Sequence, residues 1–254
     1  MTSLENKKNE NQVIEAYLYA SDKARLKDMV SDMGAKASDA LLNAMNALRA
    51  FDLELADKVI GNDDVIDELE EQIDQECLYS IAMRQPMRED LRFVYVVMKI
   101  ITDLERIGDQ AVNVALRLQK LAAIDPNKDC LMMNEIDEMA ELDMTMLKAA
   151  LDAFIKEDPS IVELTRASRH KVHVLRDGAV EELMKNSSPT SLQDLTTAKL
   201  FASMWILRHL SRISDHVLNL AEKIAFIATG ISPLTMKKKG KKDTVNTRTI
   251  NLGM

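Results

Sequence analysis

The sequence predicts an all-α fold made of two tandem three-helix bundles, and three observations support this prediction. Aromatic residues make up only 4% of the 254 residues, and glycine and proline are scarce, whereas strands favour aromatic and β-branched residues. Apolar residues recur with the spacing of one helix face, as in Ile66, Leu69, Ile73 and Cys77. Finally, the second half of the chain resembles the first, which indicates a duplicated helical unit.

Helix-breaking residues divide the chain into six expected helices. The breaks are Gly61–Asn62, Gln85–Pro86, segment 124–129, Asp158–Pro159 and segment 186–191. The helices are expected at 20–52, 54–84, 87–122, 131–157, 159–185 and 191–229. Pro86 and Pro159 suit the first turn of a helix, and Asp158 suits the cap before one. The expected domains are a first repeat at 20–123 and a second repeat at 131–230, each with antiparallel neighbours.

The internal repeat is clearest when residue 103 is aligned with residue 209, an offset of 106 positions. DLERIGDQAVNVA then lies over HLSRISDHVLNLA. The identical pairs are Leu104/Leu210, Arg106/Arg212, Ile107/Ile213, Asp109/Asp215, Asn113/Asn219 and Ala115/Ala221. A common helical period would align apolar residues by chance, but it would not also align Arg, Asp and Asn. We therefore interpret the two halves as a tandem duplication.

Charge and composition narrow the classes of function. The net charge of −8 argues against nucleic acid as a partner. The two cysteines, Cys77 and Cys130, form no CxxC pair and suit a reducing compartment. The N-terminus has no apolar signal region, and the most apolar window, 93–102, is too short to span a bilayer. We therefore expect a soluble, cytoplasmic protein.

Acidic residues at helical spacing predict a metal site. Glu105 and Asp109 share a helix face, and the preceding helix carries a second acidic series that includes Asp63 and Asp67. If these faces meet, the carboxylates converge, and such all-oxygen ligation suits Mg, Mn, Ca or iron. Alternatively, the acidic stripes face solvent, as charge periodicity usually does. Gly108 indicates that another helix approaches closely at this level.

These segments resemble the PhoU family of phosphate-signalling regulators. LADKVIGNDDVIDELEEQI, RQPMREDLR and MKIITDLERIGDQAVNVA resemble the first repeat of that family, and RHLSRISDHVLNLAEKIAFIATG resembles the end of its second repeat. The resemblance runs from about Leu26 to Gly230. It implies two three-helix bundles without known catalysis, and an acidic E/D-xxx-D signature that binds multinuclear metal clusters in some members.

The resemblance also implies a function. We expect a regulator of phosphate transport and homeostasis that restrains the phosphate-starvation response through contact with the ATPase subunit of the phosphate ABC transporter and with a sensor histidine kinase. It implies a homodimer, and it favours Asp63, Asp67, Glu105 and Asp109 as ligands of Fe, Mn, Mg or Zn. Two alternatives remain: an accessory subunit of an ion-coupled phosphate transporter, and a metal-dependent phosphohydrolase. Because the chain has no P-loop, HExxH or GxSxG motif, we expect no enzyme activity.

The second repeat departs from the acidic signature. Ser211 stands where the signature has an acid, and the same offset places Arg169 and His173 opposite Asp63 and Asp67. One interpretation is a degenerate site in which cationic side chains replace the charge of the metal. The other is a nitrogen-rich site that prefers zinc. Its ligands would be His170, His173, His209 and Asp215.

The chain ends in a basic tail, expected at 231–254. Five lysines fall between Lys237 and Lys242, and such a run of like charge favours an extended, disordered segment. Alternatively, the lysines hold the acidic body near anionic lipid.

Overall fold

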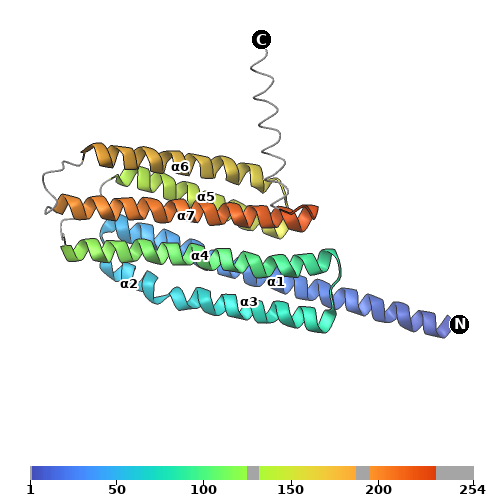
Figure 1. Ribbon diagram of the computed structural model, residues 1–254. Helices are drawn as coiled ribbons and strands as arrows, with labels where there is room; N and C mark the ends of the chain where they lie inside the picture. The colour runs from blue at the N-terminus through green and yellow to red at the C-terminus, as the bar shows by residue number, and fades with distance from the viewer. Residues whose placement is uncertain (1, 125–131, 187–194, 233–254) are drawn as a thin grey trace, which may run out of the picture.

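The computed structural model describes residues 2–124, 132–186 and 195–232, and the secondary structure in these ranges is helical with short turns. The helices are α1 (Thr2–Ala50), α2 (Leu53–Gly61), α3 (Asp63–Arg84), α4 (Glu89–Ile124), α5 (Met133–Lys156), α6 (Ile161–Asn186) and α7 (Leu195–Thr229). The predicted all-α fold is confirmed. The first bundle consists of α1 to α4 and the second of α5 to α7 (Figure 1).

Two of the predicted helices differ from those observed. The helix expected at 54–84 is divided at Asn62, whose φ of −97° and ψ of 5° lie outside the α-helical region, so that α2 ends and α3 begins there. The first helix is longer than predicted, because no glycine or proline interrupts the chain before Gly34.

The prolines expected in first helical turns lie ahead of their helices. Arg88 has a φ of +52°, which a right-handed helix does not contain, so α4 begins only after it and after Pro86. Asp158 accepts a hydrogen bond from the backbone N–H of Ser160 at 2.9 Å, but α6 begins at Ile161, so Asp158 lies ahead of the cap position predicted for it.

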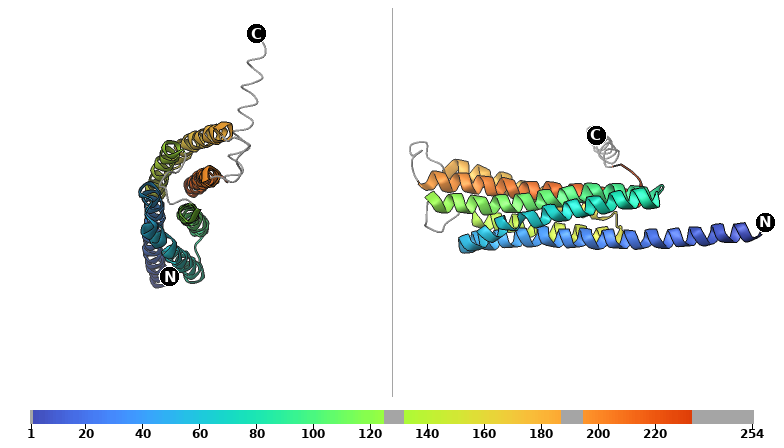
Figure 2. Two further views of the ribbon diagram at one scale, coloured as in Figure 1. Left: turned by 90° about the vertical axis from the view of Figure 1, so that its left-hand side faces the viewer. Right: turned by 90° about the horizontal axis from the view of Figure 1, so that it is seen from below.

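The helices form an arc with two helices inside it. Seen end-on, α6, α5, α1 and α3 follow the arc, and α4 and α7 lie side by side on its inner side (Figure 2). Contacts between α1 and α5 and between α4 and α7 join the bundles into one body. Phe93 of α4 and Phe154 of α5 are both buried and stack with ring centroids 6.0 Å apart. The two repeats therefore share a continuous apolar core.

A local two-fold axis relates the repeats where α4 and α7 run antiparallel. Nδ1 of His216 lies 3.0 Å from an oxygen of Asp103, and Nδ1 of His209 lies 2.9 Å from Oε1 of Gln110. The 106-residue offset aligns Asp103 with His209 and Gln110 with His216. Each of the two contacts is therefore the counterpart of the other in the duplicated fold. Sequence reasoning missed both pairs. The duplication thus determines how the bundles pack together, as well as how each one folds.

Gly108 lies where α4 approaches α3 closely, as its place within a helix predicts. A Cβ added to Gly108 would lie 2.7 Å from Cδ1 of Ile66, which is closer than van der Waals contact allows. In the second repeat the corresponding residues are Ser214 and Val172. Both of these residues are also buried, and the larger residue at the position of Gly108 is accompanied by a smaller residue at the position of Ile66.

No helix in the described ranges is long and apolar enough to cross a membrane. Cys77 is buried and carries a free thiol, whereas Cys130 lies outside the described residues. The predicted basic tail also lies outside them, apart from residues 231–232.

Candidate metal centre

The helices α3 and α4 bring five acidic side chains to one place on the first bundle. These are Asp63, Asp67 and Glu70 of α3 and Glu105 and Asp109 of α4. Burial raises the pKa of Glu105 to about 7, with further increases from the charges of Asp109, Glu70 and Asp67, while Arg106 acts in the opposite direction. The acidic side chains of α3 and α4 therefore repel each other.

Burial likewise raises the pKa of Asp63, and the neighbouring charges of Asp109, Asp67 and Asp64 add to this effect. Because Asp63 begins α3 and Asp109 lies in the middle of α4, this effect of Asp109 on the pKa of Asp63 acts between the two helices. Asp67 follows Asp63 by about one turn of α3 and is exposed to solvent.

The contacts of these carboxylates leave one oxygen incompletely satisfied. Nη1 of Arg106 donates to Asp109 at 3.0 Å, and Nε of Arg106 lies 3.1 Å from Oε2 of Glu105. The second contact has the distance of an ion pair without the geometry of a hydrogen bond, so buried Oε2 has no hydrogen-bond donor among the described residues. Glu70 accepts a hydrogen bond from the Thr102 hydroxyl at 3.0 Å. A buried carboxylate oxygen without a donor favours an external cation.

The chemistry of this donor set fits a hard cation. Carboxylate oxygens suit Mg, Mn and iron, and the side chain of Arg106, which is 53% exposed, can leave the carboxylates without disturbing the core. As the side chains stand, no group of three or more His, Cys, Asp or Glu residues in the described ranges is close enough to hold one ion. If a metal binds, Asp63, Asp67, Glu105 and Asp109 would hold it after their side chains turn toward each other.

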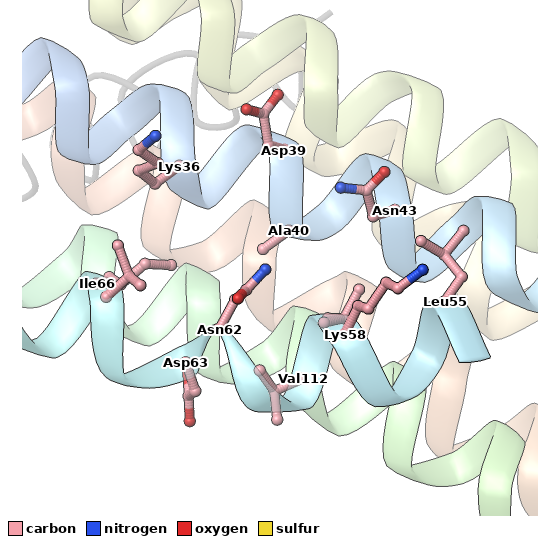
Figure 3. A pocket seen from close by; sticks show the side chains of 12 residues that line it. Lys36, Asp39, Ala40, Asn43, Leu55, Lys58, Asn62, Asp63, Ile66 and Val112 are labelled. Carbon is pink, nitrogen blue, oxygen red and sulfur yellow. The ribbon is translucent and has the colours of Figure 1, made fainter. Parts of the chain in front are cut away.

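A cavity of about 350 Å³ adjoins this cluster between α1, α2 and α3 (Figure 3). Ile66 and Val112 are among its lining residues, and charged side chains of both signs also line it. Figure 3 shows Lys36 and Lys58 on separate sides of the cavity rather than converging on its centre. The cavity therefore selects no single sign of ligand charge.

The corresponding place on the second bundle holds cationic side chains. Arg169 of α6 donates a hydrogen bond to Asp215 of α7, and Nε2 of His173 lies 3.2 Å from the same carboxylate oxygen. Nη1 of Arg176 donates to the hydroxyl of Ser211 at 2.8 Å. The 106-residue offset gives the correspondences Asp63/Arg169, Asp67/His173, Glu70/Arg176, Glu105/Ser211 and Asp109/Asp215.

The four ligands predicted for a nitrogen-rich second site are only partly brought together. His173 contacts Asp215, but His170 is exposed, and buried His209 faces Gln110 of the first bundle. Burial and then the charges of Arg117, Arg212 and Arg208 lower the pKa of His209 to about 4, so its ring is neutral at physiological pH. The ion pair of Arg169 with Asp215 is the arrangement expected of the degenerate site.

Two residues of the second site escaped sequence reasoning. Asp143 of α5 is fully buried, and neither of its carboxyl oxygens has a hydrogen-bond partner among the described residues. Burial and the nearby charge of Asp215 raise the pKa of Asp143 well above its ordinary value. Asp143 could have been identified from the sequence, because it is an acid within the apolar stripe of α5. Arg176 could have been identified because the 106-residue offset aligns it with Glu70.

The fold matches one known family. The PhoU domain family matches residues 30–118 and residues 136–224, which places one copy in each bundle. The chain belongs to the PhoU family. A PhoU relative from Rhizobium meliloti, named a phosphate-specific transport system accessory protein, is 31% identical over 207 residues, which cover 80% of this chain and 84% of the relative.

Other PhoU proteins are similar over the same extent. A homologue from Pseudomonas aeruginosa with the same descriptive name is 31% identical over 219 residues, covering 82% of this chain and 85% of its own. The crystal structure of PhoU from Pseudomonas aeruginosa superposes with a TM-score of 0.77 and 29% identity, covering 84% of this chain and all of that one. The PhoU structure from Streptococcus pneumoniae, at 22% identity and a TM-score of 0.75, shares the fold.

Proposed function

We propose that this chain regulates phosphate transport and the phosphate-starvation response in the cytoplasm, through contacts with the ATPase subunit of a phosphate ABC transporter and with a sensor histidine kinase. The observation that carries the proposal is the presence of two PhoU domains that cover most of the described chain. Relatives at about 30% identity are named accessory proteins of a phosphate-specific transport system. Since these names describe an accessory role, the proposal assigns the chain no catalytic step.

The proposal includes a metal centre at Asp63, Asp67, Glu105 and Asp109, with Fe, Mn, Mg or Zn as the ion. Its support is the mutual repulsion of these carboxylates and the buried oxygen of Glu105 that lacks a donor. A bound cation would neutralise this charge and hold α3 against α4. Because α4 also packs against α7, the occupied site would stiffen the helix that joins the two bundles.

The proposed homodimer is tested by light scattering of the purified chain.

Affinity purification from phosphate-replete cells, with metal analysis of the same sample, tests the proposal. We expect the chain to recover the transporter ATPase subunit and the sensor kinase, and to carry metal. Recovery of an ion-coupled phosphate transporter instead would favour an accessory subunit of that system. Release of phosphate from model esters, abolished by Glu105→Ala, would favour a metal-dependent phosphohydrolase and overturn the regulatory proposal.

A further inference from the structure

An aromatic and cationic surface lies where the C-terminal end of α4 meets the N-terminal end of α7. Trp205, Phe201 and Ile124 are 41%, 54% and 59% exposed, and they line a cleft of about 220 Å³ with Arg117 and Lys120. We call these residues, together with Arg208, the Trp205 surface. The ends of α4 and α7 that form it lie at the left in Figure 1, far from the first turn of α4. Exposed Trp and Arg side chains around an apolar cleft are typical of binding hot spots.

The charges of the Trp205 surface are all positive. Segments 110–124 and 195–214 contain no acidic residue, although the whole chain has a net charge of −8. The guanidinium of Arg117 lies 4.6 Å from the centroid of the Trp205 ring, and that of Arg208 lies 5.6 Å from it. Buried Nε of Arg117 has no hydrogen-bond acceptor among the described residues. The surface thus offers cationic donors that lack a carboxylate partner within it.

An acidic side chain that contacts this part of α4 already has a hydrogen-bond partner. Asp57 of α2 accepts a hydrogen bond from the Gln119 amide, so it does not neutralise the Trp205 surface. An external carboxylate would therefore meet Arg117, Lys120 and Arg208 without displacing an internal partner that the structure records.

The local two-fold axis provides a comparison at the opposite end of the same helix pair. The 106-residue offset relates Phe201 to Tyr95, Trp205 to Lys99 and Arg117 to Lys223. There the cation is satisfied within the chain, since Lys223 donates to the backbone carbonyl of Lys99 and to Asp103. Among the described residues, the Trp205 end therefore combines an exposed tryptophan and an apolar cleft with cations that contact no carboxylate.

We propose that the Trp205 surface binds an acidic amphipathic segment of a partner protein, with an apolar side chain in the cleft and carboxylates on Arg117, Lys120 and Arg208. Charge complementarity favours such a partner, because like or neutral surfaces would leave these cations unpaired on burial. The overall negative charge of the chain disfavours a nucleic acid. The choice of probe rests on the proposed function, which names the transporter ATPase subunit as a partner.

Trp205 is the only tryptophan in the chain, so incorporation of 5-fluorotryptophan gives a single fluorine NMR signal at this surface. The full chain is labelled and titrated with the unlabelled ATPase subunit from the same organism, and the affinity is measured independently by calorimetry. We expect the signal to shift or broaden to saturation. Trp205→Ala, and Lys120→Glu combined with Arg208→Glu, should each weaken binding at least tenfold. The matched controls at the related end, Tyr95→Ala and Lys99→Glu, should leave the affinity within about twofold.

The other outcomes are distinguishable. Binding by calorimetry with an unmoved fluorine signal would overturn the Trp205 surface and leave the proposed function standing. Absence of binding by the unmodified chain would overturn the proposed ATPase contact and this surface with it. A signal that moves when the chain alone is concentrated, or when anionic lipid vesicles are added without the ATPase, would overturn the proposal in favour of a second copy or a membrane. Circular dichroism confirms that each variant is folded.

Discussion

The α3–α4 site and the α6–α7 site occupy the same place in a duplicated fold and carry opposite charge. In the first, Glu105 and Asp109 are raised in energy by acids of α3, and among the described residues Arg106 is the cation that pairs with both. In the second, Arg169 and His173 surround the remaining Asp215. The comparison teaches that corresponding positions of a duplicated fold can carry mutually repelling acids in one repeat and an internal ion pair in the other.

The difference has consequences for each bundle. Like charges at the first site repel each other until something neutralises them, whereas at the second site Asp215 is paired with Arg169 and His173, and buried Asp143 lacks a hydrogen-bond partner among the described residues. The first site is therefore suited to respond to a ligand, and the second to hold α6 against α7. Substitutions that exchange the two arrangements test this division directly.

Removal of two acids from the first site should have the largest effect. We expect Glu105→Ala combined with Asp109→Ala to remove most of the bound metal, because both replace carboxylate ligands by methyl groups. Metal content per chain is measured by mass spectrometry, with Asp215→Ala as the matched control in the second site. Unchanged metal in the double variant would contradict the assignment of the first site.

Conversion of the second site into the first should add a metal site. The substitutions are Arg169→Asp, His173→Asp, Arg176→Glu and Ser211→Glu, which restore the acids found at the corresponding positions of the first repeat. With Asp215 retained, the variant should bind additional metal when refolded with it. If the folded variant binds no additional metal, these acids on the same arrangement of helices are not sufficient for metal binding. The charge difference between the two repeats would then not explain a difference in metal binding.

The affinity of the first site should depend on pH. Metal must displace the proton of Glu105, whose pKa is raised to about 7, so affinity should be about tenfold weaker at pH 6 than at pH 8. The folding stability of the metal-free chain should change with pH in the opposite direction. Because the pKa of Glu105 is raised from 4.5 to about 7 in the folded chain, its contribution to stability is fully present below pH 4.5 and is lost as the pH rises through 7. Calorimetric titration at both pH values measures the affinity. Glu105→Gln should abolish most of its pH dependence, and a profile that the variant retains would assign it to another group.

Replacement of the buried acid of the second bundle should have the smallest effect. The pKa of Asp143 is raised by burial, so its contribution to folding is lost as pH rises toward that raised value. Asp143→Asn should therefore raise the melting temperature more at pH 8 than at pH 5, on the order of 2–4 °C for each kcal/mol recovered. Exposed Asp152→Asn on the same helix is the control. An equal shift at both pH values would show that Asp143 does not titrate in this way.

Much of the fold could be predicted because helical periodicity is a local property. The stripe through Ile66, Leu69, Ile73 and Cys77 and the repeat at residues 103 and 209 were sufficient to predict two helical bundles. The interruption at Asn62 coincides with the Gly61–Asn62 break in the sequence, but the helix expected at 54–84 ran through it because apolar periodicity continues from α2 into α3. Boundaries of this kind depend on a few torsion angles that the pattern does not specify.

The candidate site could be predicted only in part. Spacing placed Glu105 and Asp109 on one face, but the structure shows that Arg106 reaches both carboxylates. Spacing also allowed His209 to join Asp215, whereas the structure directs it to Gln110 across the local two-fold axis. Residues on different helices are brought together by packing, which the period of a single helix does not describe.

By itself, the sequence determined the helical class, the duplication and the reversal of charge between the repeats, because each follows from residue type and spacing along one chain. Only the tertiary structure decided that α4 and α7 meet about a two-fold axis, that Asp143 is buried without a partner, and that Trp205 is exposed beside Arg117. These features depend on which helix faces become neighbours, and that choice is made by the packing of the whole core rather than by any one segment.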